Sequence, residues 1–178
     1  MIQLSTVFWF LIIMFAVIGS LRGWTREIVA AAGIILALFA TWQFDGVVLQ
    51  PLLRGATPQQ VFFVYTGILV LVTFFAYQTP TFASRLSDGR MWGSGRMGLQ
   101  ERLLGLIIGG VNGYLLFGSI WYYLDRTGYP FAPFIYAPAP ETMSAAMVQG
   151  LPLIFLVQNN LLTILVVVLF LFVLISMI

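Results

Sequence analysis

The sequence contains no cysteine and no histidine, and all eight of its basic residues are arginine. Without cysteine there are no disulfides and no thiolate nucleophiles, and without either residue there are no Cys/His zinc sites and no His-ligated haem. The absence of lysine also excludes Schiff-base chemistry and a P-loop lysine. We therefore expect no enzymatic activity, no catalytic residues, no metal site and no cofactor.

Charge is also scarce: 8% of the 178 residues are charged, 61% are hydrophobic, and the mean hydropathy is +1.00. A soluble domain is about 25% charged, so this chain has too few charges to cover a surface that faces water. A net charge of +2 does not suggest nucleic-acid binding. The composition predicts a membrane protein whose partners are the lipid bilayer and other membrane subunits, with no nucleic acid or nucleotide.

Long apolar stretches predict an all-α membrane protein with five transmembrane helices. They cover residues 4–21, 28–44, 61–79, 103–124 and 151–178. Gln158, Asn159 and Asn160 interrupt the last stretch, and the run of residues 161–178 just reaches across a bilayer, so this polar triplet is expected near one interface. The predicted organisation is a four-helix domain (1–124), an outer loop (125–150) and a C-terminal helix (151–178).

The arginines predict the orientation, because short basic loops stay in the cytoplasm. Six lie in the connections after the first and third spans: Arg22, Arg26, Arg85, Arg90, Arg96 and Arg102. The other two, Arg54 and Arg126, lie in the remaining connections. This asymmetry places the N-terminus outside and the C-terminus in the cytoplasm. A cleaved signal peptide over residues 1–21 is the alternative, but it would begin with basic residues, and we expect the first helix to be retained.

Aromatic residues are expected at both membrane interfaces, where the ring is buried and its polar group reaches water. Trp42 and residues 121–123 would form the outer belt, and Trp24 and Trp92 the inner one. The outer loop contains four prolines, which prevent a regular helix. We expect an extended segment on the outer membrane surface, either a plain tether or a binding surface.

Small residues recur on the fourth predicted helix at Gly105, Gly109 and Gly113. This spacing lets another helix backbone approach closely, so helix packing is favoured over a ligand or ion role. Asn112 is expected to form a hydrogen bond to another helix. Replacing Gly109 with leucine should cost more stability than the same change at Gly118.

Charged residues precede the second and fourth helices: Arg22, Arg26 and Glu27 in one turn, and Glu101 and Arg102 in the other. A carboxylate is stabilised at a helix N-terminus by the helix dipole. If the two turns lie at one depth, Arg26 can meet Glu101 and Glu27 can meet Arg102. The alternative is that each charge is solvated separately among the lipid headgroups.

A glycine-rich string over residues 93–98 fits the pattern of a dinucleotide-binding loop, G-x-G-x-x-G. That motif requires a preceding strand and a later acidic residue, and both are missing. A flexible basic loop near anionic headgroups explains it better. The acidic residues Asp88, Glu101, Asp125 and Glu141 are too scattered to predict a carboxylate pair or a metal cluster.

Two motifs are present in the sequence: Arg22-Gly23-x-x-Arg26-Glu27, and then Glu101-Arg102-x-Leu104-Gly105-x-x-x-Gly109-x-x-x-Gly113. Together they resemble the motifs of the colicin V production protein (CvpA) family. The resemblance covers residues 1–124. The chain departs from the family pattern at Glu101, which is usually Asp, at Asn112, which is usually Arg, and at Ser5, which is often acidic. The loop after residue 124 and a fifth span are additions to the usual four helices.

The resemblance implies a multi-pass protein of the bacterial inner membrane without established catalytic activity, linked to colicin export or envelope homeostasis. It would act as a scaffold or as an accessory in secretion. An auxiliary subunit of a photosynthetic or respiratory complex is the alternative. A small channel or transporter is less favoured, because few polar residues lie within the predicted spans.

Overall fold

The computed structural model describes residues 3–78 and 98–177, which form helices and contain no strand. Among the described residues, four single helices are long and apolar enough to cross a membrane: α1 (Leu4–Arg22), α2 (Trp24–Gln43), α4 (Pro58–Gln78) and α6 (Leu99–Arg126). A bent pair of segments, Met143–Gln158 and Leu161–Leu171, could form a fifth crossing. The shorter π-helix η1 (Asp45–Leu49) and α3 (Gln50–Leu52) connect α2 to α4, and α7 (Met143–Val148), α8 (Pro152–Gln158) and α9 (Leu161–Met177) follow α6. The predicted all-α membrane class is confirmed. The glycine-rich string, apart from Gly98, lies outside the described residues.

A single residue, Gly23, separates α1 from α2. Its φ of 85° is a conformation that side chains rarely allow, and its N–H donates to the carbonyl of Gly19 at 2.9 Å. Because the turn is so short, α2 begins at Trp24 rather than at the predicted residue 28. Glu27 therefore lies in the first turn of α2.

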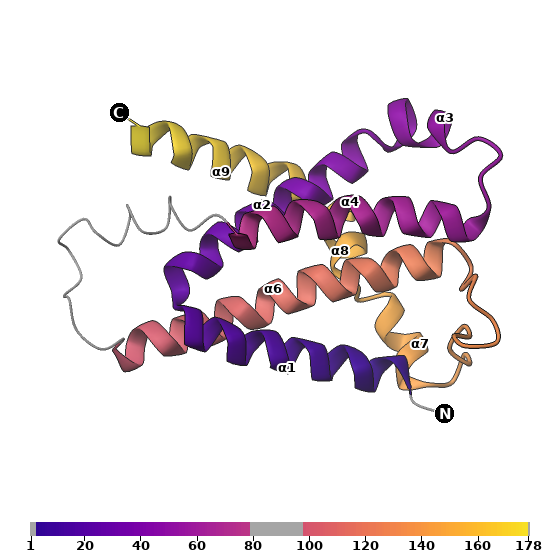
Figure 1. Cartoon of the computed structure of the whole chain (residues 1–178), viewed down its shortest axis with the longest axis horizontal. Coiled ribbons are helices and arrows are strands. Elements are labelled where there is room, and N and C mark those ends of the chain that lie inside the picture. The colour runs from indigo at the N-terminus through magenta and orange to yellow at the C-terminus, as the bar shows by residue number, and fades with distance from the viewer. Residues whose placement is uncertain (1–2, 79–97, 178) are drawn as a thin grey trace.

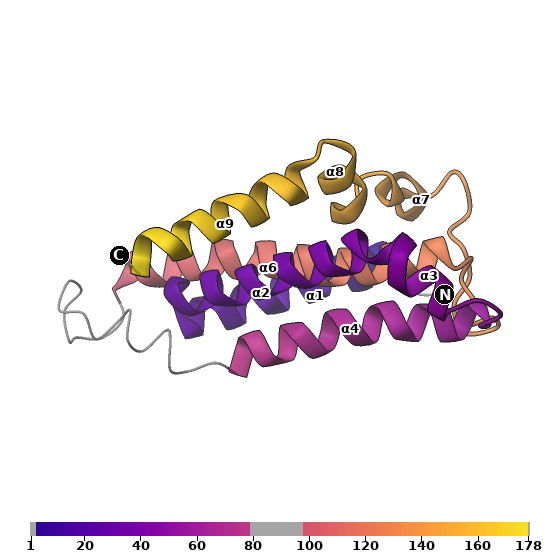
Figure 2. The same cartoon turned by 90° about the horizontal axis from the view of Figure 1, so that it is seen from above.

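The helices form three layers in which α1, α2 and α6 occupy the middle (Figure 2). On one face lies α4, which packs mainly on α2, and on the other lie α7, α8 and α9. Figure 1 shows the turn at Gly23, the start of α6 and the C-terminus at one end of the bundle, called here the Gly23 end. The N-terminus, α3 and the loop after Arg126 lie at the other, the Arg126 end.

The main hydrophobic core lies among α2, α4 and α6, where Ile34, Leu38 and Leu69 have no exposed surface. The predicted outer aromatic belt is partly wrong. Trp121 and Tyr123 are buried, and their burial is tolerated because their polar groups form hydrogen bonds inside the protein. Trp121 donates to the hydroxyl of Tyr129 at 3.1 Å, and the hydroxyl of Tyr123 lies 2.9 Å from that of Thr41.

The C-terminal stretch is bent: the direction changes by 57° between the segment Met143–Gln158 and α9. Asn160 has a φ of 52°, which asparagine tolerates better than most residues. The side-chain amide of Asn159 donates to the carbonyl of Phe155 at 3.0 Å. The bend lies between the two ends of the bundle (Figure 2). The expectation that the polar triplet lies near a membrane interface stays a prediction.

The connection after α6 has no regular helix until α7, as its prolines predict. It is tied back to the bundle at several points. The Oγ of Ser144 accepts from the backbone N–H of Ser5 at 3.2 Å and donates to the Oγ of Ser5 at 3.0 Å. Phe131 packs edge-on against Phe62 of α4, with ring centroids 5.1 Å apart. The loop is thus part of the folded structure at the Arg126 end.

Candidate functional site

A close helix contact joins α1 to α6 through the three glycines at positions 105, 109 and 113. A Cβ at Gly109 would lie 2.5 Å from the carbonyl oxygen of Phe15 and 2.9 Å from the Cα of Gly19. At Gly105 the obstacle is again backbone, the carbonyl of Gly19. Only glycine permits such an approach, in which dispersion contacts run along both helices. The contact holds α6 and the Gly23 turn in a fixed register.

This register brings Asn112 of α6 against Glu27 of α2, and neither residue has any exposed surface. The amide nitrogen of Asn112 donates to the backbone carbonyl of Glu27 and to its Oε2, both at 2.9 Å. Its Oδ1 has no partner. The paired polar groups therefore join two helices in the interior of the bundle.

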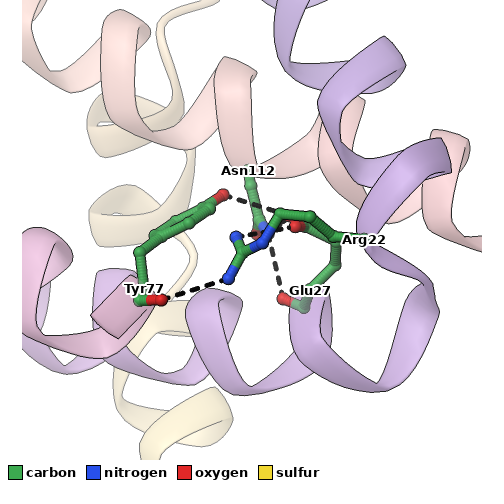
Figure 3. A network of polar contacts seen from close by, with 4 residues as sticks. All are labelled: Arg22, Glu27, Tyr77 and Asn112. Atoms are coloured by element: carbon green, nitrogen blue, oxygen red, sulfur yellow. Dashed lines mark hydrogen bonds and ion pairs between the residues drawn. The ribbon is translucent and has the colours of Figure 1, made fainter. Parts of the chain in front are cut away.

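Arg22 and Tyr77 complete the network around Glu27 (Figure 3). A guanidinium nitrogen of Arg22 lies 3.0 Å from Oε1 of Glu27, and the Tyr77 hydroxyl donates to Oε2 at 3.1 Å. Arg22 also donates to the backbone carbonyl of Tyr77 at 3.2 Å, and its guanidinium carbon lies 4.3 Å from the centre of the Tyr77 ring. The end of α1, the start of α2, the end of α4 and the middle of α6 meet at one carboxylate.

The arrangement is suited to holding an ionised carboxylate away from water. A buried charge is tolerated when an opposite charge and hydrogen-bond donors satisfy it, and here one arginine, one hydroxyl and one amide donate to Glu27. Tyr77 and its contact with Arg22 were not singled out from the sequence. Its place at the end of an apolar run, on the same side as the arginines, was the available signal.

The expected pairs between the two charged turns do not form, although the structure describes all four residues. Arg26 and Arg102 are exposed, and Glu101 is partly exposed. The assumption that both turns lie at one depth is wrong. Glu27 reaches Asn112, which is about 15 Å further along α6 than Arg102 at 1.5 Å per residue. Glu27 therefore takes its cation from the preceding turn, at Arg22.

A second charged cluster lies at the Arg126 end and was also missed. Arg126 pairs with Asp45 at 2.8 Å, and the side chains of Gln50 and Tyr65 also donate to this carboxylate. Burial alone would raise the pKa of Asp45, but these donors and the charge of Arg126 hold it below its usual value of 3.8. The pair links α6 to η1, so both ends of the bundle are fastened by a charge pair.

The family of the chain follows from a comparison with family models. The model described as colicin V production protein matches residues 4–150. The chain belongs to the colicin V production protein family. A search of curated proteins and a search of solved structures gave no significant match. The family match runs beyond residue 124 and includes the proline-rich loop and α7, whereas α8 and α9 follow it.

The structure shows what surrounds position 112, where the chain departs from the colicin V production family pattern. The pattern has Arg where this chain has Asn112, and the side chain at this position contacts the Glu27 carboxylate. In this chain Arg22 supplies the positive charge and Asn112 a neutral donor. At Ser5, another position where the chain departs from the pattern, the side-chain Oγ accepts a hydrogen bond from Ser144 of α7.

Proposed function

We propose that this chain is a non-enzymatic, multi-pass protein of the bacterial inner membrane that acts as a scaffold or accessory in secretion, such as colicin export, or in envelope homeostasis. Family membership supports the membrane role. The observation that carries the scaffold role is the Glu27 network, in which both carboxylate oxygens are occupied by side chains from other helices. The buried charge is used to join helices.

The orientation proposed is an external N-terminus and a cytoplasmic C-terminus. Arg22, Arg26 and Arg102 lie at the Gly23 end, and Arg54 and Arg126 belong to the connections at the opposite end. The termini lie at opposite ends of the bundle, as an odd number of crossings requires (Figure 1). The basic excess supports a cytoplasmic Gly23 end.

Deletion of the gene in its own host tests the proposed role. We expect the deletion strain to release less exported protein, or to become sensitive to detergents that stress the envelope, and the wild-type gene to restore both. An Arg26→Gln variant is the matched control, because that side chain is exposed. Unchanged export and unchanged envelope resistance in the deletion strain would contradict the proposal.

The alternative function is an auxiliary subunit of a large energy-transducing complex. The exposed apolar surface of α9 supports it. Ile164, Val168 and Phe170 of this helix are each more than half exposed, and such a surface suits contact with lipid or with partner helices. Purification in a mild detergent distinguishes the two functions. Co-migration with a pigment or quinone complex would favour the subunit role.

A further inference from the structure

The connection after α6 exposes large side chains although its backbone is held in place. Phe134 is 90% exposed, and Tyr136 is more than half exposed. The ring of Phe131, three residues earlier, packs against the rings of Phe62 and Phe63 of α4, with centroids 5.1 and 5.5 Å apart. The N–H of Phe134 donates to the carbonyl of Phe131 at 2.8 Å. The two exposed side chains are therefore carried by a folded loop that is fastened to α4.

The connection between α2 and α4 also exposes apolar side chains at the Arg126 end. Phe44, Val47 and Leu52 are each more than half exposed. This connection lies at the upper edge of the bundle in Figure 1, and the loop after α6 lies at the lower edge. The exposed side chains of the two connections are together called the apolar collar: Phe44, Val47, Leu52, Phe134 and Tyr136.

The loop after α6 is poorly suited to face water alone. Residues 127–140 contain no charged side chain, whereas about a quarter of the residues of a soluble domain are charged. Four of these residues are prolines, which have no backbone N–H. The loop therefore has fewer donors to leave unpaired where water is scarce, and an unpaired donor is costly in such a place.

The collar lies where the long helices end. At 1.5 Å per residue, the 21 residues of α4 extend about 32 Å, close to the roughly 30 Å thickness of the hydrocarbon. A crossing by α4 therefore places its first turns near one interface. Phe131 contacts Phe62 and Phe63, in the second turn of α4, so the loop folds back along this helix. Phe63 is itself 61% exposed, so the loop borders a surface of α4 that faces outward from the bundle.

We propose that the apolar collar rests in the lipid headgroup region of one leaflet and fixes the level of the bundle in the membrane. Aromatic side chains favour this region, where the ring is buried and a polar group such as the Tyr136 hydroxyl reaches water. The interface surrounds the bundle in one plane and can cover both edges of the collar. A partner protein or a second copy on one edge would leave the other edge uncovered.

The absence of cysteine allows one fluorophore to be attached at a chosen position without background labelling. In phosphatidylcholine vesicles, labels at Phe134→Cys and Leu52→Cys should be quenched by lipids with a nitroxide near the headgroup and should resist aqueous iodide. Glu141→Cys, exposed in the same loop but outside the uncharged stretch, is the matched control and should be quenched by iodide. A label at Leu71→Cys, on the exposed face of α4, should respond to a nitroxide deep in the acyl chain.

Each other occupant of the collar has its own outcome in this experiment. Equal iodide quenching at positions 52, 134 and 141 would place the collar in water. Protection that disappears when the protein is diluted with lipid would identify a second copy, and protection found only in native membranes would identify another protein. Any of these three results would overturn the proposal.

A substitution at position 134 separates anchoring from folding. With the fluorophore at Tyr136→Cys, adding Phe134→Asp should raise iodide quenching about twofold, because a carboxylate disfavours contact with lipid, and Phe134→Trp should leave quenching unchanged. The melting temperature in detergent should be the same for both variants, since the side chain at this position is exposed. Unchanged quenching in the Phe134→Asp variant would overturn the anchoring role of the collar.

Discussion

Asn112 and Glu27, 85 residues apart, are joined twice, through the carbonyl of Glu27 and through its carboxylate. One short side chain therefore fixes both the position of α2 along α6 and the direction in which the acid points. The charge of the acid is balanced separately, by Arg22. Position and charge can be altered independently by substitution.

The first prediction separates these two roles. Arg22→Gln removes the cation and should lower the melting temperature substantially, because breaking a buried ion pair costs about 3–5 kcal/mol. The lower end applies here, since the Arg22 side chain is 24% exposed. Adding Asn112→Arg to this variant should restore part of the loss by placing a cation against Glu27. Arg26→Gln is the control. If adding Asn112→Arg restores no stability to the Arg22→Gln variant, the loss is not caused by the missing positive charge beside Glu27.

The second prediction concerns the contact of α1 with α6. Gly109→Ala should destabilise by about 1–3 kcal/mol, because a Cβ would press on backbone that cannot move aside. Gly67→Ala, with open space around it, should leave the melting temperature in detergent unchanged or slightly raised. Gly118 is not the tolerant position the sequence suggested, since its Cβ would collide with the ring of Pro152. Equal tolerance at positions 67 and 109 would contradict the close packing.

The third prediction concerns pH at the Arg126 end. The pKa of Asp45 is lowered in the folded protein, so the ionised form is favoured by folding. Its contribution is complete above the unfolded pKa of about 4 and is lost as the pH falls below that value. Asp45→Asn should therefore be less stable than wild type at neutral pH, by no more than about 1 kcal/mol because Arg126 is 37% exposed. The two melting temperatures should converge as the pH falls through the lowered pKa of folded Asp45, and a constant difference would exclude this cause.

The fourth prediction tests the orientation with reporters. A reporter active only outside the cytoplasm should work at the N-terminus and in the loop of residues 125–150, and should fail after Ile178. The opposite pattern would reverse the orientation. Activity at both termini would indicate an even number of crossings.

The sequence predicted the long helices well because each is a nearly charge-free apolar run, and hydropathy depends on composition alone. Gly105, Gly109 and Gly113 could be assigned to a helix contact from their spacing, but not to α1 in particular. The partner of Glu27 could not be predicted, because it depends on how far α2 slides along α6. Distant pairs such as Asp45 with Arg126 leave no local pattern in the sequence.

The length of α6 relates the whole bundle to membrane thickness. Between Arg102 and Asp125 it carries no charge, and at 1.5 Å per residue this segment is about 33 Å long. In a bilayer with a thinner hydrocarbon region, such a helix tilts rather than exposing its apolar ends. Because α1 is held by the glycines and α2 by Asn112, α6 cannot tilt alone. Any mismatch would turn all three helices together and move the Gly23 turn along the membrane surface.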